Sequence, residues 1–118
     1  MSSFAKLIAL LLAISLPLVS ASPTVALDIT SLERGEQIFS SNCAACHMGG
    51  GNVIRASRSL KLRDLNAHLE EYPQDPLEAL EHQIEDGKHA MPAYAGELSE
   101  EDIVAVATYV EQQAELGW

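Results

Sequence analysis

The chain has 118 residues, 47% of them hydrophobic, and a formal net charge of −10 from 17 acidic and seven basic side chains. This length allows one small domain with a limited core. The negative charge argues against nucleic acid and anionic membrane surfaces as partners.

The first residues have the layout of a secretory signal. Lys6 precedes an apolar run over residues 7–18, and small residues follow. The run is shorter than the roughly 20 residues of a membrane span, so we expect no stable membrane insertion, with an uncleaved N-terminal anchor as the alternative. Cleavage after Ala21 is an option, but the small residues near Ala26 favour cleavage there. We therefore expect residues 1–26 to be a cleaved signal peptide and residues 27–118 to form one domain.

The first helix of this domain is expected from about Thr30 to Ala44. Gly35 and Phe39 fall on one face at helical spacing. The helix leads directly into residues 43–47, after which the glycines from Gly49 onward require a turn.

The pentapeptide Cys43-Ala44-Ala45-Cys46-His47 contains both cysteines of the chain. Two thiols at this spacing can each add to a haem vinyl group, and the next histidine then lies under the iron, so the pattern is typical of c-type haem attachment. A thioredoxin-like dithiol would require a βαβ pattern, which the sequence lacks. A zinc site would require further ligands at a spacing that the other histidines do not have. A structural disulfide is the remaining alternative, and we expect none because a haem consumes both thiols.

Two helices are expected next. A weak leucine-rich stretch covers about Ser59 to Glu70 and ends before Pro73. The following helix is better marked, because Asp75 is a good N-cap, Pro76 suits the first helical position and Gly87 is placed to end it.

Met91 lies in a proline-containing loop after that helix and is the favoured sixth ligand of a haem iron. The other candidates are Met48, His68, His82 and His89. Met48 adjoins His47 and cannot reach the opposite haem face. The histidines are expected at the surface, with His89 the main rival. With both axial positions filled, no site is open to substrate or oxygen, which favours electron transfer over catalysis.

The last helix is expected from Ser99, its N-cap, to about Ala114. Its buried side is Ile103, Val106, Ala107 and Val110. The sequence shows no alternating strand pattern of useful length, so the fold class is all-α, with about four helices.

Four segments together resemble one known family. They are Gly35-x-x-Ile38-Phe39-x-x-Asn42 with the cysteine motif, Gly49-Gly50-x-Asn52-Val53-Ile54, Gly87-Lys88-x-Ala90-Met91-Pro92-Ala93 preceded by Gln83, and Gln113-Ala114-Glu115-x-Gly117-Trp118. This pattern resembles cytochrome c6, the lumenal electron carrier of cyanobacteria and algae, over essentially all of residues 27–118. The resemblance implies a cytochrome c domain with the class I cytochrome c fold, wrapped around one covalent haem c.

The resemblance also implies roles for the site residues. Cys43 and Cys46 would carry the thioethers, and His47 and Met91 would be the axial ligands. Gln83 would lie near the haem and help to keep its potential high, although an exposed helix residue is the alternative.

The resemblance also has consequences for packing. In class I cytochromes c the first helix interlocks with the last, which here implies Gly35 and Phe39 against Val106 and Tyr109. Tyr94 stands where phenylalanine is usual, so its hydroxyl needs a partner or water if it is buried.

The function implied by the resemblance is that of a soluble, monomeric one-electron carrier. It would accept an electron from cytochrome f of the cytochrome b6f complex and donate to photosystem I, or to a terminal oxidase. Candidate docking positives follow the haem motif: Arg55, Arg58, Lys61 and Arg63. The signal lacks the character of an organellar transit peptide, which favours export in a cyanobacterium to the thylakoid lumen or the periplasm. The alternatives are a low-potential cytochrome c6-like paralogue and a haem-based sensor or peroxidase-like protein in which Met91 dissociates.

Overall fold

The structure is a computed structural model that describes residues 17–18 and 23–118. Most of the expected signal, Lys6 and residues 7–16 included, lies outside the described residues. The expected cleavage after Ala26 falls inside the first helix, so processing there would remove its first residues. In the described part of the chain, no helix is long and apolar enough to cross a membrane.

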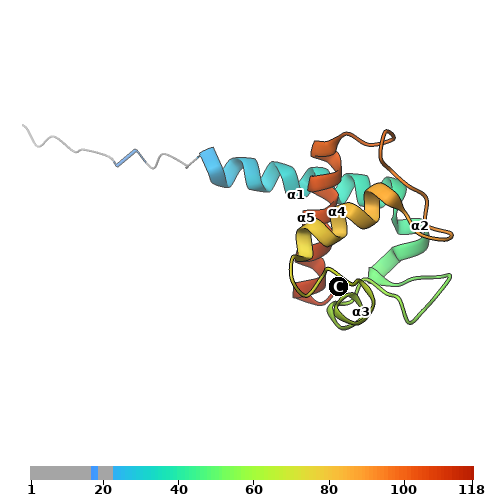
Figure 1. Cartoon of the computed structure of the whole chain (residues 1–118). Coiled ribbons are helices and arrows are strands. Elements are labelled where there is room, and N and C mark those ends of the chain that lie inside the picture. Colours follow the sequence, from blue (N-terminus) through green and yellow to red (C-terminus); the bar gives the residue numbers. More distant parts are fainter. Residues whose placement is uncertain (1–16, 19–22) are drawn as a thin grey trace, which may run out of the picture.

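The described residues form helices joined by loops, with isolated bridges in place of strands. The all-α prediction is confirmed (Figure 1). The helices are α1 Pro23–Asn42, α2 Ala44–His47, the 3-10 turn η1 Met48–Gly50, α3 Leu62–His68, α4 Pro76–Asp86 and α5 Glu100–Leu116.

The expected caps are present. The Asp75 carboxylate accepts a hydrogen bond from the Glu78 backbone N–H (3.1 Å), and the Ser99 hydroxyl accepts one from Asp102 N–H (3.1 Å). Gly87 follows α4 with φ 63°, in the left-handed range that glycine adopts without strain. Both helix starts are therefore held by the side chains that the sequence indicated.

Two boundaries differ from the prediction. Helix α1 begins at Pro23 rather than near Thr30. Helix α3 is shorter than predicted, because Lys61 before it and Leu69 after it have extended backbones. The Ser59 hydroxyl contributes to the late start, since it accepts the Lys61 backbone N–H (3.2 Å) and so draws the backbone into a turn instead of a helix.

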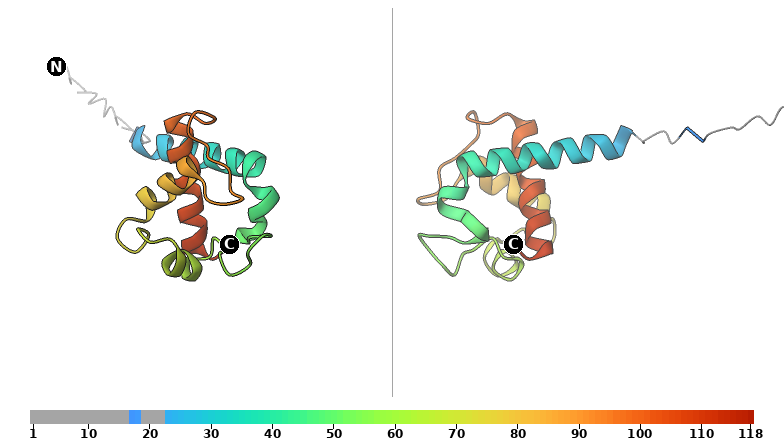
Figure 2. Two further views of the ribbon diagram at one scale, coloured as in Figure 1. Left: turned by 45° about the vertical axis from the view of Figure 1, so that its right-hand side comes forward. Right: turned by 180° about the vertical axis from the view of Figure 1, so that it is seen from behind.

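Helices α1 and α5 cross in close contact at Gly35 (Figure 2). A Cβ at Gly35 would overlap the Ala105 carbonyl oxygen and lie 2.8 Å from Tyr109 Cβ, so only glycine permits this approach. Phe39 lies one turn further along, with its ring centroid 5.4 Å from that of Tyr109. The expected interlocking of the first and last helices is present, with Ala105 as the backbone in closest contact.

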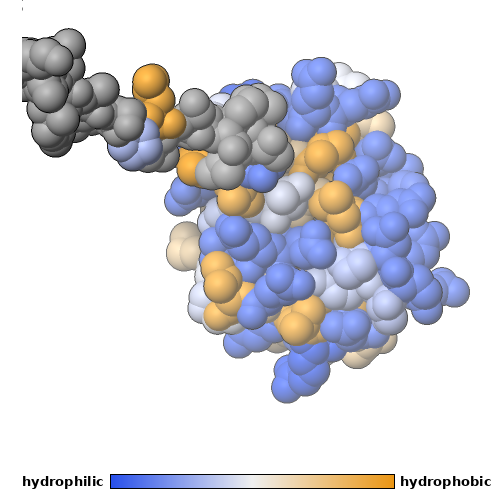
Figure 3. Space-filling view, turned by 90° about the vertical axis from the view of Figure 1, so that its left-hand side faces the viewer, coloured by the Kyte–Doolittle hydropathy of each residue, from blue (hydrophilic) through white to orange (hydrophobic). Residues whose placement is uncertain are grey.

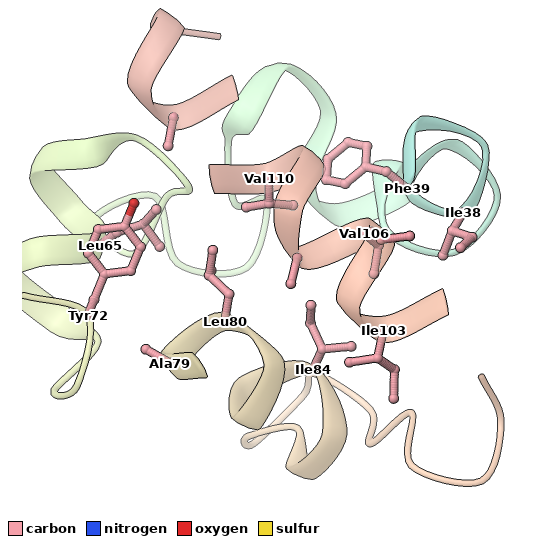
Figure 4. Packing of buried hydrophobic residues seen from close by; sticks show 13 residues of the cluster. Ile38, Phe39, Leu65, Tyr72, Ala79, Leu80, Ile84, Ile103, Val106 and Val110 are labelled. Atoms are coloured by element: carbon pink, nitrogen blue, oxygen red, sulfur yellow. The ribbon is translucent and has the colours of Figure 1, made fainter. Parts of the chain in front are cut away.

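The core continues from this crossing towards α4 and α3 (Figure 4). Val106 of α5 is fully buried, and Leu80 and Ile84 of α4 face α5 from the other side. Tyr72 closes the cluster near α3. On the face from which α1 projects, polar side chains cover most of the surface and apolar ones are scattered among them (Figure 3). The core therefore joins α1, α3, α4 and α5, and loops form the remaining wall of the interior.

Candidate functional site

The end of α1 presents the two cysteines. Cys43 N–H donates to Phe39 O (2.9 Å), and His47 N–H donates to Cys43 O (2.9 Å), so helical hydrogen bonds continue through the motif into α2. Cys43 is half-buried, whereas Cys46 is exposed, and both are free thiols. Cys43 and Cys46 are therefore not joined by a disulfide in this structure.

The imidazole of His47 is held in one orientation. Its Nδ1 lies 2.8 Å from the carbonyl oxygen of Gly51, which can only accept, so Nδ1 carries the hydrogen of that bond. The lone pair of Nε2 is then available to a metal. A backbone carbonyl on the second nitrogen is the usual way in which a ligating histidine is oriented.

The loop after the motif is tied back to the body of the protein. Gly50 has φ 74°, and a Cβ there would overlap the indole ring of Trp118. Leu60 N–H donates to Gly50 O (2.8 Å), and Trp118 Nε1–H donates to Leu60 O (2.8 Å). Residues 50, 60 and 118 thus form one hydrogen-bonded junction that holds the His47 loop in place.

Asn52 organises the next turn. Its side-chain oxygen accepts from the N–H groups of Ile54 (3.0 Å) and Arg55 (2.9 Å), and its amide donates to Arg58 O (2.9 Å). One short polar side chain therefore adds three hydrogen bonds to the few backbone bonds of this loop, such as that from Arg58 N–H to Arg55 O (2.9 Å).

Met91 lies in a tight turn after α4. Lys88 N–H donates to Met91 O (3.1 Å) and Met91 N–H donates to Lys88 O (2.9 Å), while His89 between them has φ 53°. Gly87 is required here, because a Cβ would come within 2.7 Å of the backbone of Met91, Pro92 and Ala93. The turn fixes the thioether relative to the end of α4.

Two side chains connect the Met91 turn to the rest of the site. Gln83 of α4 donates from Nε2 to the Met91 sulfur at 3.7 Å. Tyr94 donates its hydroxyl hydrogen to Asn42 O (3.0 Å), directly before Cys43. The extra hydroxyl of Tyr94 therefore has the partner that it needs, and that partner directly precedes the cysteine motif.

These parts line one cavity of about 260 Å³, and residues of α1, α2, α3, α4 and α5 all contribute to its wall. Both cysteines, His47, Met91 and Gln83 all line it. Among the described residues, its apolar wall includes Phe39, Leu60, Leu65, Leu69, Leu80, Ile84, Val106 and Val110.

The candidates for the sixth iron ligand differ in their position relative to the cavity. His82 is absent from the cavity wall and its Nδ1 lies 2.9 Å from Glu71 Oε2 at the surface. Met48 is 75% exposed and is also absent from the wall. His68 and His89 do line the cavity, but both are exposed. Met91 is the candidate that is partly buried, packs on the core and receives a hydrogen bond on its sulfur.

The chemistry of the cysteines separates the remaining interpretations. Burial raises the pKa of the Cys43 thiol to about 11, so it is protonated at neutral pH. A redox-active dithiol needs a thiolate, which a lowered pKa provides. A zinc site needs further ligands, and among the described residues no group of three or more His, Cys, Asp or Glu side chains could hold a metal ion. A thiol pair, an oriented imidazole and a thioether around an apolar cavity are instead a donor set that suits a covalently attached haem.

Sequence reasoning missed a polar pair in the cavity wall. Ser59 and Asp64 are both buried, and the Ser59 hydroxyl donates to Asp64 Oδ2 at 2.6 Å. Their five-residue spacing has no simple periodic meaning, so no signal in the sequence separated them from surface residues.

Known proteins match this chain in sequence and in fold. A family model described as cytochrome C oxidase, cbb3-type, subunit III matches residues 30–110. Cytochrome c6 of Microcystis aeruginosa is 54% identical over 84 residues, which is 71% of this chain and 99% of that protein.

Two solved structures extend the likeness to the fold. Cytochrome c6 from the diatom Phaeodactylum tricornutum is 45% identical with a TM-score of 0.70, covering 74% of this chain and 98% of that one. Cytochrome c6C from Synechococcus sp. PCC 7002 is 40% identical with a TM-score of 0.65, covering 72% and 99% respectively. A cytochrome c6 is an electron-transfer protein rather than an enzyme, and it carries one covalently bound haem c. By its sequence, its helical fold and its haem motif, this chain belongs to the cytochrome c6 family.

Proposed function

We propose that the chain is a diffusible one-electron carrier that accepts an electron from cytochrome f of the cytochrome b6f complex and donates to photosystem I, or to a terminal oxidase. Family membership establishes electron transfer with one haem c. The partners, the potential and the compartment belong to the proposal.

The proposed haem site uses the four residues of the cavity that suit the group. Cys43 and Cys46 would hold the haem through thioethers, and His47 and Met91 would be the axial ligands, with Gln83 beside the methionine. When bound, the haem supplies an iron that alternates between ferric and ferrous without making or breaking a bond. The convergence of all these side chains on one cavity is the observation that carries the proposal.

The protein's own residues would keep this chemistry to electron transfer. The Gly51 carbonyl orients His47, and the turn at residues 88–91 fixes Met91, so both ligand side chains are held before the iron changes charge. The apolar wall excludes water from the interior face. Little reorganisation then accompanies a change of oxidation state.

An exposed apolar patch beside the motif supports docking at this face. Met48, Val53 and Ile54 are each at least 66% exposed, and Val53 N–H donates to Cys46 O (3.0 Å), which places that residue next to the second cysteine. Arg55 and Arg58 line the cavity directly after this apolar segment. An apolar centre with a basic rim suits a brief encounter with an acidic partner.

The proposal also includes the compartment in which the protein acts. Residues 1–26 would direct export and be removed, and the domain at 27–118 would act as a monomer in the thylakoid lumen of a cyanobacterium, or in the periplasm. The domain would carry all 17 acidic residues and six of the seven basic ones, because Lys6 lies in the signal, and the resulting charge of −11 would keep it in solution and away from anionic lipid.

The first test is the midpoint potential of the purified holoprotein and of two variants. We expect a strongly positive value for the natural protein, and for Met91→Ala a lower value together with binding of added imidazole. His89→Ala is the matched control and should change neither property. If His89→Ala lowered the potential and admitted imidazole while Met91→Ala changed neither property, His89 and not Met91 would be the sixth ligand.

The potential also separates the carrier from its alternatives. A natural protein whose potential lies several hundred millivolts below that of the b6f complex would be a low-potential paralogue. Binding of imidazole to the natural protein at modest concentration would indicate a sensor or a peroxidase-like protein.

Docking is tested separately with Arg58→Glu. Arg58 is the sharper choice, because Arg63 is ion-paired with Asp64 (3.0 Å). Electron donation to photosystem I membranes should slow at low salt and converge with the natural rate at high salt, where exposed charges are screened. Equal rates at every salt concentration would remove Arg58 from the docking surface.

A further inference from the structure

Asp64 is a buried carboxylate in the wall of the haem cavity, and the proposed function leaves it without a role. It lies in the first turn of α3, and its side chain is 8% exposed. It lines the same cavity as the cysteines and Met91. Charged side chains are rarely buried unless they are paired, so its partners decide what it does.

Both oxygens of Asp64 are hydrogen-bonded. Oδ2 accepts from the Ser59 hydroxyl at 2.6 Å, and Oδ1 accepts from Arg63 Nε at 3.0 Å. These two bonds lower the pKa of the Asp64 carboxyl below its ordinary value. The group is therefore a carboxylate at neutral pH, and both of its bonds are the kind that stabilises the charged form.

The two partners of Asp64 neutralise its negative charge only in part. Ser59 is neutral, and the Arg63 side chain is 85% exposed, so water and salt screen its positive charge. The carboxylate is turned away from solvent, where screening is weak. The Asp64 carboxylate therefore contributes a net negative charge to its side of the cavity.

We propose that Asp64 sets the reduction potential, its charge favouring ferric over ferrous iron and so lowering the midpoint potential, with Arg63 acting in the opposite direction. The proposal rests on the haem site of the proposed function. The physical basis is that ferric haem carries one more positive charge than ferrous haem, and a fixed anion nearby stabilises the more positive state. Asp64 touches neither thiol nor ligand in the described contacts, so it acts at a distance on the iron.

A purely structural role is the competing account. The Ser59–Asp64 bond pins the segment before α3, and any change there can loosen the cavity wall. Ser59→Ala removes this bond but keeps the charge. It should lower the unfolding temperature and leave the potential close to that of the natural protein.

The experiment measures midpoint potentials of holoprotein variants by spectroelectrochemical titration. Asp64→Asn removes the charge and retains the shape, so the ferrous-to-ferric equilibrium should shift towards ferrous by about three- to tenfold, where tenfold corresponds to 59 mV for one electron. Arg63→Gln should shift the potential down by a smaller amount, because the arginine is exposed. Opposite signs at neighbouring residues are expected from charge and not from a common loosening of the fold.

The Arg34–Asp102 pair supplies matched controls. It is an ion pair of 2.8 Å between α1 and α5, and neither residue lines the cavity. Asp102→Asn and Arg34→Gln change the net charge of the molecule in the same way as the test variants. Their shifts should be less than a third of those at residues 64 and 63.

Three results would overturn the proposal. One is an unchanged or lowered potential in Asp64→Asn, another is a shift of equal size in Asp102→Asn, and the third is a shift of the same sign in both Asp64→Asn and Arg63→Gln. If Asp64→Asn fails to fold, the surface variant Arg63→Gln still tests the proposal. A raised or unchanged potential in Arg63→Gln would contradict the charge effect. The shifts are measured against the natural protein, so a low natural potential would count against the carrier role and leave this inference standing.

Discussion

The crossing of α1 and α5 and the loops around the cavity are built by different means. At the crossing, Gly35 brings two regular helices into backbone contact, and Phe39 and Tyr109 fill the space beside it. The loops at residues 48–61 and 87–98 have little regular structure and are held by individual hydrogen bonds such as that of His47 to the Gly51 carbonyl. The difference teaches that stability resides mainly in helix packing, whereas the properties of the haem depend on the side chains that line the cavity, from loops and helices alike. Substitutions should therefore divide into those that move the unfolding free energy and those that move the potential.

The largest effect is expected for Gly35→Ala. The new methyl group would overlap the Ala105 carbonyl, and neither helix backbone can yield easily. We expect a loss of about 3 kcal/mol of unfolding free energy, at the upper end for overpacked sites and well above the roughly 1 kcal/mol that alanine gains in a helix. Urea unfolding of the holoprotein measures it.

Gly96→Ala is the control for that substitution. No atom lies within 4 Å of a Cβ there, so its cost is only the backbone strain at φ 81°, about 1–2 kcal/mol. Equal losses at residues 35 and 96 would show that close packing is not what makes Gly35 necessary.

Trp118→Ala should come next, at about 2 kcal/mol. The indole is partly buried, its centroid lies 5.3 Å from that of Phe39, and it donates to Leu60 O. The estimate is below the 3–5 kcal/mol of a fully buried tryptophan because this ring is partly exposed. Trp118→Phe keeps the ring contact and loses the hydrogen bond, so its cost should be about 1 kcal/mol. Thermal unfolding of both variants measures these losses. If Trp118→Phe were as destabilising as Trp118→Ala, the ring contact with Phe39 would not contribute to stability.

Gln83→Leu should affect the potential and not the stability. The amide hydrogen bond withdraws electron density from the Met91 sulfur. In the proposed site, this would make the thioether a weaker donor to ferric iron. We expect the potential to fall by up to about 59 mV, a tenfold change in the equilibrium, with the unfolding free energy changed by less than about 1 kcal/mol. Gln112→Leu, on α5 and outside the cavity wall, is the control and should leave the potential alone.

The smallest effect is a pH dependence from His82. Hydrogen bonding to Glu71 raises the pKa of His82, with Glu78 and Glu85 adding to the shift. A raised folded-state pKa means that protonation stabilises the fold. The contribution is fully present below about pH 6.5, the unfolded-state value, and is lost as the pH rises through the folded-state pKa.

Comparison of the natural protein with His82→Asn checks this sign. The difference in urea midpoint should be larger near pH 5.5 than near pH 8.5, windows chosen around the ordinary histidine value. The Arg34–Asp102 pair is the control, because the pKa of Asp102 is lowered and its contribution is constant across this window. A difference that grows with pH would contradict the assignment.

Local features of this fold could be predicted from the sequence, because their causes lie within a few residues of one another. The caps at Asp75 and Ser99, the glycine after α4 and the haem motif are examples. The all-α class followed from the spacing of apolar residues. The start of α1 was predicted too late because residues up to 26 were assigned to the signal, although Ser22 and Pro23 are residue types that favour an N-cap and a first helical position.

Contacts between distant segments were beyond the sequence. The Tyr94 hydroxyl finds Asn42 O across 52 positions, and Trp118 reaches Leu60 across 58. The Ser59–Asp64 pair is close in sequence, yet only the burial of both residues shows that it belongs to the cavity. Each of these depends on how the helices pack, which sequence spacing does not express.

The junction of residues 50, 60 and 118 has a consequence for biosynthesis. A polypeptide is synthesised from its amino end, so the His47 loop is made long before the tryptophan that packs on Gly50. Until Trp118 is in place, the loop lacks its indole contact and the Leu60 carbonyl lacks its hydrogen bond. The His47 loop therefore reaches its final position only after segments far apart in the chain have met.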